Sequence, residues 1–361
     1  MKIGIITFHC AHNYGAVLQA YAFSSYLRSQ GYDASIIDYR PNYLVRGYAR
    51  GGVSCWLAKS PIRTVRKCVT EPFLMKMRAE RWDKFNDFIN KRLPLYPFDR
   101  FKNDSEFDIV FYGSDQIWNT VLTKGNIDDI YWGKYSKSRA VSYAVSMGEY
   151  YPSGVEKKKV SELLANFMAF SARESGVKAF IESTTKKNAK LVCDPVFLLP
   201  RELWESSIPV VTEKPYVLCY NLLHSKKCKK QAHIISELMG IQLIEIYGDI
   251  RLICTKSKTY MTLGPLEFVS YIRNASFIVT SSFHGTAFSI VFQKPFYSLG
   301  LQKRSDRVKN LLKLVGLEDR YLTDVKSNVE LNLNYETASD KLCEYIADSK
   351  DFLKEVIHKN C

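Results

Sequence analysis

The sequence predicts an α/β protein with two Rossmann-like domains that face a cleft. Runs of β-branched and aromatic residues alternate with helical patterns along the chain, which is typical of parallel sheets covered by helices. The length of 361 residues suffices for two domains. Its 46% hydrophobic and 24% charged residues are ordinary for a soluble protein. We therefore expect a first domain over residues 1–200 and a second over residues 201–361.

The first domain is predicted to begin with a parallel β–α–β unit. A buried strand over 2–8 precedes a helix over 16–28, and a second strand follows over 34–39. The next predicted element is a long amphipathic helix over 71–92, where large apolar residues recur near the 3.6-residue period. Three further strands are expected at 107–112, 139–146 and 168–172.

The second domain repeats this alternation. Its most informative stretch, Asn274 to Gly300, is predicted as a buried strand, a tight loop, a short helix over 286–292 and a second strand. The strands expected in this domain are 216–220, 242–247, 277–280 and 296–299. The other helices expected are 228–239, 265–273, 305–315 and 338–359, and the last of these can pack back onto the first domain.

His284 is the leading candidate for a functional residue in that stretch. It follows the carboxyl end of a buried strand, where open α/β sheets bind their ligands. The amide groups of Gly285, Thr286 and Ala287 are predicted to be unpaired donors at a helix start, ready for an anion. A purely structural histidine in a turn is the alternative, but the position and the small neighbours favour a site.

Other strand ends also carry polar residues. Asp115 follows strand 107–112, where it is either a ligand-facing carboxylate or a helix N-cap, and the sequence leaves both open. Arg173 follows the apolar run FMAFSA, which argues against a simple surface role. His9 and Asn13 lie in the first strand–helix loop, which lacks the GxGxxG pattern of nicotinamide-binding proteins.

The charge and the cysteine content limit which binding partners and which cellular compartment are expected. The net charge is +14, and residues 45–92 alone carry twelve Lys and Arg against four Asp and Glu. No nucleic-acid-binding motif accompanies this charge, so nucleic acid is the least favoured partner. The nine cysteines show no metal-ligand spacing, and no metal site is expected. Without a recognisable signal peptide or membrane span, these features predict a reduced, cytoplasmic protein.

Five segments of the chain resemble the polysaccharide pyruvyl transferase family, and they extend from near the start to Gly300. They are NYGAVLQAYA at 13–22, GSDQIWN at 113–119, VSYAVSMG at 141–148, CDPVFLL at 193–199 and SSFHGTAFSIVFQKPF at 281–296. The resemblance implies a glycosyltransferase-B-like fold. It also implies transfer of pyruvate from phosphoenolpyruvate, as co-substrate with no other cofactor, to a sugar of a bacterial surface polysaccharide or its lipid-linked precursor. The products would be a pyruvate ketal and phosphate.

The same resemblance implies roles for individual residues. Arg173 matches the arginine that binds phosphoenolpyruvate, and His284 matches the histidine that contacts it. Many members carry arginine two residues before this histidine, whereas this chain has Ser282. Arg304, Arg307 or a first-domain residue could then complete the donor site, and Lys294 is a further cation. On the acceptor side the resemblance implies Asp115, as a second catalytic residue, together with Asn13 and His9.

Two other functions are compatible with the sequence. A metal-independent nucleotide-sugar glycosyltransferase would share the fold and a phosphate-holding second domain. A non-catalytic carbohydrate-binding protein would share the core but would not need Arg173 and His284 together. The basic segment 45–92 is either a solvated face over a packed helix or a peripheral contact with an anionic inner membrane face, where each basic group contributes roughly 1 kcal/mol.

Overall fold

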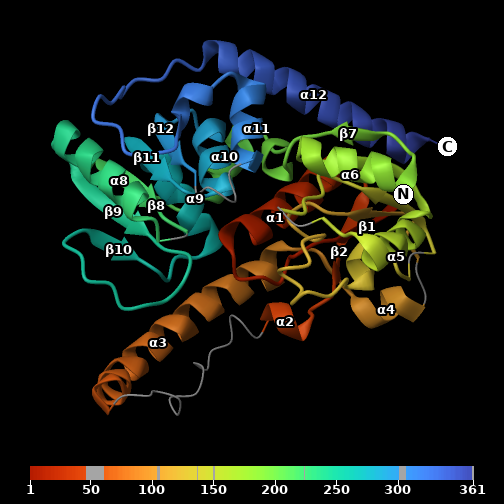
Figure 1. Cartoon of the computed structure of the whole chain (residues 1–361), viewed down its shortest axis with the longest axis horizontal. Helices are drawn as coiled ribbons and strands as arrows, with labels where there is room; N and C mark the ends of the chain where they lie inside the picture. The colour runs from red at the N-terminus through yellow and green to blue at the C-terminus, as the bar shows by residue number, and fades with distance from the viewer. Residues whose placement is uncertain are drawn as a thin grey trace.

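Two parallel β-sheets form the centre of the protein, one in each half of the chain (Figure 1). The computed structural model describes residues 1–45, 61–103, 106–135, 137–148, 151–222, 224–300 and 306–359, with the backbone alone over 61–69. The first sheet ends at Leu191 and the second begins at Tyr216.

The first sheet has seven strands in the order β3-β2-β1-β4-β5-β6-β7. Every neighbouring pair is parallel, and Ile5 at its centre lies opposite Ile36 and Phe111. The first predicted strand ends earlier than expected because the backbone turns after Ile6, where Thr7 O accepts from His9 N. The strands are β1 (Lys2–Ile6), β2 (Asp33–Asp38), β3 (Leu95–Pro97), β4 (Ile109–Tyr112), β5 (Arg139–Ser142), β6 (Phe167–Ala172) and β7 (Ala189–Leu191).

The helices of the first domain include one that is longer than predicted. The helix expected over 71–92 already begins at Pro61, and proline suits the first position of a helix. Its amino-terminal half projects away from the body of the protein (Figure 1). The helices are α1 (Tyr14–Ser29), α2 (Asn42–Val45), α3 (Pro61–Arg92), α4 (Phe98–Asn103), α5 (Gly154–Leu164) and α6 (Ser175–Thr185), with a short 3₁₀ turn at Asp129–Trp132.

The second sheet has six parallel strands in the order β10-β9-β8-β11-β12-β13. The strands are β8 (Tyr216–Tyr220), β9 (Gln242–Ile246), β10 (Lys258–Tyr260), β11 (Phe277–Thr280), β12 (Phe296–Leu299) and β13 (Tyr321–Leu322). Three of these have the predicted bounds, whereas the short edge strands β10 and β13 were not predicted. A strand of two or three residues is too short to show a period of its own.

The second half of the chain also supplies six α-helices to the described structure. They are α7 (Arg201–Ser207), α8 (Lys226–Met239), α9 (Pro265–Asn274), α10 (Phe283–Val291), α11 (Asp306–Val315) and α12 (Glu336–His358), with 3₁₀ turns at Pro195–Phe197 and Glu318–Arg320. Among the helices that the structure describes, none combines the length and the apolar character needed to cross a membrane.

The predicted start of the helix over 286–292 is wrong, because α10 already begins at Phe283. Ser282 caps it, and the Ser282 hydroxyl accepts from the Gly285 amide at 3.4 Å. The Thr286 amide donates to the Ser282 carbonyl at 3.0 Å. The amides of Gly285 and Thr286 are therefore already used inside the first turn. The donors that a helix start offers to a ligand move to the residues before them.

Aromatic packing joins the two domains at the start of α1. The Tyr14 ring stacks on Phe268 of α9 with centroids 4.3 Å apart, and its hydroxyl donates to Leu263 O at 3.0 Å. Arg81 of α3 is buried at the same junction and donates to the Tyr14 hydroxyl at 2.8 Å and to Met261 O at 2.9 Å. A guanidinium thus ties first-domain and second-domain groups inside one apolar junction.

The final helix α12 runs back over the first domain (Figure 1). Its Ser349 hydroxyl accepts from the Cys193 amide at 2.8 Å, and the Phe352 ring packs on Tyr143. Beyond these contacts, Arg139 of β5 donates to the carbonyls of Ile357 at 3.5 Å and Lys359 at 3.2 Å. Residues from the second half of the chain therefore complete the first domain.

His12 makes the domain junction sensitive to acid. Burial of the ring lowers its pKa from 6.5 to about 4, and the neighbouring Arg81 charge adds to the effect. A histidine whose folded-state pKa is lowered stabilises the fold above its unfolded pKa and loses that contribution as the pH falls. We expect up to about 3 kcal/mol of unfolding free energy to disappear between about pH 6.5 and pH 4.

Urea unfolding at pH 7 and pH 4.5 tests this expectation. The His12→Gln variant should lose less stability between these pH values than the wild type, since glutamine does not titrate. His233→Gln on α8 is the matched control, because that side chain is half-buried away from the junction. An equal loss in the wild type and in His12→Gln would show that His12 does not carry the pH dependence.

Candidate active site at the interdomain cleft

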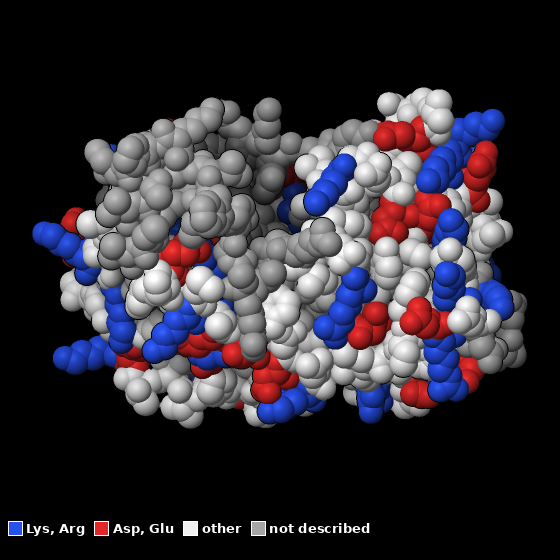
Figure 2. Space-filling view, turned by 90° about the horizontal axis from the view of Figure 1, so that it is seen from below, with Lys and Arg blue, Asp and Glu red and all other residues white. Residues whose placement is uncertain are grey.

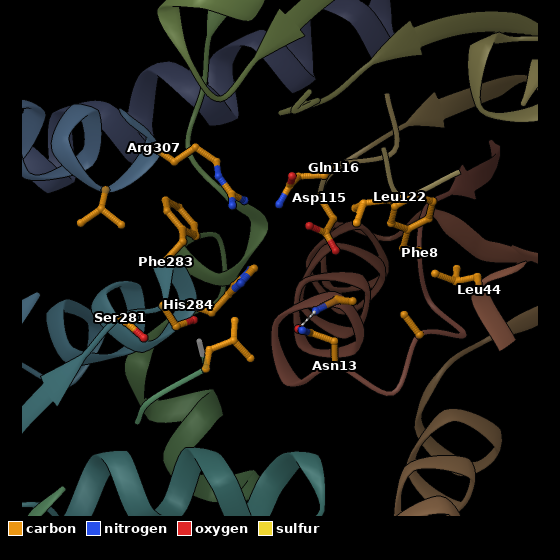
Figure 3. A pocket seen from close by; sticks show the side chains of 15 residues that line it. Phe8, Asn13, Leu44, Asp115, Gln116, Leu122, Ser281, Phe283, His284 and Arg307 are labelled. Carbon is orange, nitrogen blue, oxygen red and sulfur yellow. Dashed lines mark hydrogen bonds between the residues drawn. The ribbon is translucent and has the colours of Figure 1, made fainter. Parts of the chain in front are cut away.

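A cleft of about 210 Å³ lies between the carboxyl ends of the two sheets. The loops after β1 and β4 form one wall, and the loop after β11 with the starts of α10 and α11 forms the other. Figure 3 shows His284, Phe283 and Arg307 on the second-domain wall, opposite Asn13, Asp115, Gln116 and Phe8 on the first-domain wall.

His284 points from the first turn of α10 into the space between the domains (Figure 3). Its ring lies directly on Gly15 of α1, where a Cβ atom would stand 2.0 Å from the His284 Nδ1. Asn13 caps α1 beside this contact and accepts from the amides of Gly15 at 2.9 Å and Ala16 at 3.4 Å. The absence of a side chain at Gly15 thus lets the histidine reach across to the first domain.

Asp194 lies between two of the predicted site residues. Its Oδ2 is 2.6 Å from Arg173 Nη1 and 3.5 Å from His284 Nε2. Burial alone would raise the pKa of this carboxyl, but Arg173 and His284 outweigh it and hold the pKa at about 2. Asp194 therefore remains an anion that faces both side chains at neutral pH.

Arg173 does not line the 210 Å³ cleft. It faces a separate, much smaller space of about 10 Å³, which it shares with Asp194, Phe283 and Arg307. The Phe283 ring covers the guanidinium, with 4.9 Å from the Arg173 Cζ to the ring centroid. The Arg173 Nε and Nη2 are buried and have no hydrogen-bond partner among the described residues. Phe283 therefore separates these donors from the cleft.

Arg307 brings a cation to the cleft from the first turn of α11. It lines both the cleft and the small space around Arg173. In the amide orientation that satisfies its surroundings, Gln116 accepts from Arg307 Nη1 at 3.0 Å and Nη2 at 2.8 Å. Of the residues named for the missing family arginine at Ser282, Arg307 lies at the cleft, and Arg304 lies outside the described residues.

Glu174 is a buried carboxyl behind Arg307. Burial raises its pKa, against the opposing charges of Arg173 and Arg307. Its Oε1 accepts from the Ser146 hydroxyl at 2.5 Å and lies 3.8 Å from Arg307 Nε. This contact joins the first domain to α11 on the side away from the cleft.

Asp115 lines the cleft, and the alternative that it caps a helix is wrong. The residues after it form turns, and the next helical segment begins only at Asp129. Asp115 has a φ of 63°, a conformation that aspartate tolerates better than most residues. Its carbonyl accepts from the Ser146 amide at 3.1 Å, which holds the loop in place. The carboxylate is thereby directed into the cleft beside Gln116 (Figure 3).

Two predicted site residues lie elsewhere in the fold. The His9 ring is fully buried and bonds Asp38 Oδ1 through Nε2 at 2.8 Å, so it does not line the cleft. Lys294 precedes β12 and therefore lies at the amino edge of the sheet, opposite to His284. Burial lowers the Lys294 pKa, and the nearby charges of Arg273 and Arg201 lower it further.

Gly285 and Thr286 have structural contacts in place of the anion contacts that the sequence suggested. A Cβ atom at Gly285 would stand 2.3 Å from Thr280 Oγ1, so glycine allows α10 to approach β11. The Thr286 hydroxyl is buried, 3.1 Å from Ser282 O and 3.0 Å from Ser298 Oγ. Ser282 itself lines the cleft as the cap of α10.

Four residues of this site were not predicted from the sequence: Gln116, Glu174, Asp194 and Phe283. Each adjoins or lies within a segment that was singled out, but none has a signal of its own. Their roles depend on partners far away in the chain, such as Arg307 for Gln116. Within the described ranges, no three His, Cys, Asp or Glu side chains gather in a way that could hold a metal ion.

A family model described as polysaccharide pyruvyl transferase matches residues 13–302. The chain has no significant match among curated proteins.

Solved structures resemble the fold at low sequence identity. A putative UDP-N-acetylglucosamine 2-epimerase from Listeria monocytogenes is 9% identical with a TM-score of 0.53, covering 100% of this chain and 97% of its own. A UDP-GlcNAc 2-epimerase from Methanocaldococcus jannaschii is 12% identical with a TM-score of 0.47, covering 98% and 100%. Together with the two parallel sheets, the first likeness confirms the predicted glycosyltransferase-B-like fold.

The contact between Gly15 and His284 can be tested by Gly15→Ala. The added Cβ would overlap the ring, which costs about 1–3 kcal/mol and outweighs the gain of up to about 1 kcal/mol in helix propensity. We expect a lower free energy of unfolding in urea. In a His284→Ala background the same change should be neutral or stabilising, because the overlapping ring is gone. Equal effects in both backgrounds would contradict the contact.

Proposed function

The chain belongs to the polysaccharide pyruvyl transferase family, and we propose that it transfers pyruvate from phosphoenolpyruvate to two hydroxyls of one sugar. The acceptor is a bacterial surface polysaccharide or its lipid-linked precursor, and the products are a cyclic ketal and phosphate. The observation that carries this proposal is that the two walls of the cleft differ in chemistry, with basic side chains on one wall and a carboxylate on the other. Arg307, His284 and a helix start face the carboxylate of Asp115 across the cleft.

The reaction sets clear demands on such a site. The methylene carbon of phosphoenolpyruvate gains a proton, and an acceptor hydroxyl adds to the adjacent carbon and gives up its own proton. A second hydroxyl then displaces phosphate and closes the ketal. Anion-binding groups are needed for the carboxylate and the phosphate, and positioned acids and bases are needed for the protons.

The second-domain wall supplies the donor site in this proposal. Arg307 offers a planar fork of donors for a phosphate or carboxylate, and charged hydrogen bonds of this kind contribute roughly 1.5–3 kcal/mol each. The first turn of α10 adds amide donors and the positive end of its dipole. His284 donates the proton to the methylene carbon. Arg173, behind Phe283, reaches the donor only when that ring moves aside.

The first-domain wall suits a sugar acceptor. Phe8, Leu44 and Leu122 give it an apolar surface against which the C–H face of a sugar ring can pack. Asp115 lies beside them and accepts the proton of the attacking hydroxyl. A nucleotide-sugar glycosyltransferase would use a similar cleft, but the family match favours pyruvyl transfer.

Donor binding and phosphate release test the proposal. We expect phosphoenolpyruvate, but not a UDP-sugar, to raise the melting temperature, and phosphate release to require a glycan acceptor.

The kinetics of variants test the individual residues. Arg307→Gln should chiefly raise the KM for phosphoenolpyruvate, whereas His284→Ala should chiefly lower kcat. Arg173→Lys should lose most activity, since one ammonium cannot replace a fork of donors. Arg201→Gln on the exposed side of α7 is the matched control and should behave as the wild type.

Three outcomes would count against this assignment. Near-normal kinetics in His284→Ala and Arg173→Lys would remove the residues on which it depends. A thermal shift with the UDP-sugar alone would favour glycosyl transfer. Activity that a chelator abolishes and a divalent ion restores would contradict the proposal that the reaction needs no metal.

Peripheral membrane contact is a further part of the proposal, tied to a lipid-linked acceptor. Within the basic segment 45–92 that suggested it, the side chains of residues 46–69 lie outside the described part of the structure. Of the others, Arg81 is buried at the domain junction, and Arg78 and Lys84 form ion pairs with acidic residues. On the described part of the face in Figure 2, basic and acidic residues are intermingled. The projecting half of α3 exposes Phe73 at 61% and Met75 at 45%, which adds apolar groups next to that segment.

Vesicle flotation tests the membrane contact. We expect the wild type to bind vesicles with anionic lipid at low salt and to leave them as salt rises, because screening weakens the attraction. The triple change of Arg63, Arg66 and Lys67 to Gln should weaken binding. The same triple change at Lys157, Lys158 and Lys159 on α5 is the control of equal charge. A wild type that stays free of anionic vesicles at low salt would show that the charge is ordinary surface.

A further inference from the structure

Asp194 is a single buried carboxylate that contacts both domains beside the cleft. It lies after β7 and is 1% exposed. Its Oδ1 accepts from the Val196 amide at 3.0 Å, which fixes the carboxylate plane. Its Oδ2 faces Arg173 of the first domain at 2.6 Å and His284 of the second domain at 3.5 Å. Oδ1 thus fixes the position of the side chain, and Oδ2 contacts the two candidate site residues.

The two nitrogens of the His284 ring face opposite charges. The ring belongs to the first turn of α10, and its Nδ1 edge lies on the first turn of α1 at Gly15. Both helix starts carry positive partial charge, which disfavours a proton on the nitrogen that faces them. The Nε2 edge faces the Asp194 carboxylate, which favours a proton there. The two effects point to the same arrangement of the ring.

We propose that Asp194 is a positioning residue that holds the neutral His284 ring with its proton on Nε2, so that Nδ1 is the nitrogen that takes up a proton and passes it to the donor. This inference rests on the proposed function, in which His284 handles the proton of the donor. The Nε2 atom is buried without a hydrogen-bond partner among the described residues, and a carboxylate 3.5 Å away favours the tautomer that carries its proton on that nitrogen. Because Arg173 shares the same oxygen, Asp194 also keeps the guanidinium and the imidazole at a fixed separation.

The structure contains a second Asp–His pair that serves as an internal comparison. His9 Nε2 is 2.8 Å from Asp38 Oδ1, and neither residue lines the cleft. Arg40 bonds the same Asp38 oxygen at 2.6 Å, so this pair also includes a guanidinium. The Asp38 pair therefore has the chemistry of the Asp194 pair without its position.

Nitrogen NMR of ¹⁵N-histidine-labelled protein measures the tautomer directly. Spectra are recorded at about pH 8.5, above the ordinary range of histidine titration, and the signals that vanish in His284→Gln belong to His284. We expect an Nε2-protonated ring in the wild type. In Asp194→Asn the His284 signals should move toward the other tautomer. In Asp38→Asn only the His9 signals should change.

Kinetics give a second readout of the same change. We expect Asp194→Asn to lower kcat by at least about 10-fold, the smaller of the losses found when the partner that orients a functional histidine is replaced, with a smaller change in KM for phosphoenolpyruvate. Asp38→Asn should retain the wild-type kcat. A structural role alone would change stability without changing the tautomer.

The wild-type spectrum keeps the proposal testable even if Asp194→Asn does not fold. An Nδ1-protonated His284 in the wild type would overturn the proposal, as would an unchanged tautomer in a folded Asp194→Asn protein. The spectra need no substrate. An absence of pyruvyl transfer would therefore overturn the proposed function while leaving the tautomer result to be judged separately.

Discussion

The contact of the His284 ring with the bare backbone of Gly15 is the constraint on which the site depends. It exists because a helix start in each domain reaches the other across the cleft, without a side chain between them. The stacked rings of Tyr14 and Phe268 hold the same turn of α1 against α9. Any change in the angle between the domains would therefore separate His284 from both α1 and Asp194. The cleft is complete only while this packing holds.

The sequence was sufficient for the parts of the fold that local patterns determine. The buried strands β8, β11 and β12 have periodic or continuous apolar runs, and the cleft follows from where parallel strands end. The helix start at Phe283 was missed because the Ser282 cap looked like part of a loop. Asp194 and Phe283 could not be assigned because their partners across the domains, His284 and Arg173, are distant in the chain. His9 and Lys294 lie away from the cleft, and this too is decided by tertiary packing that the sequence does not show.

Arg307 illustrates how a charge can be conserved in space while its position in the sequence changes. The resemblance to the family led us to expect an arginine at the start of α10, and this chain has a capping serine there. The guanidinium at the cleft comes instead from the next helix, α11, and Gln116 and Glu174 of the first domain surround it. An anion bound beside Arg307 would therefore contact a side chain that residues of both domains hold in place. Ligand binding and domain contact are then energetically linked.

The return of α12 to the first domain has a consequence for biosynthesis. Three first-domain residues, Cys193, Tyr143 and Arg139, contact residues of α12, which leaves the ribosome only after the second sheet has been made. The part of the first domain that α12 covers stays exposed while the intervening residues are synthesised. Long-range closure of this kind slows folding, because the entropy of a large loop is lost before the contacts form. A nascent chain stalled before residue 336 would expose that apolar surface to chaperones.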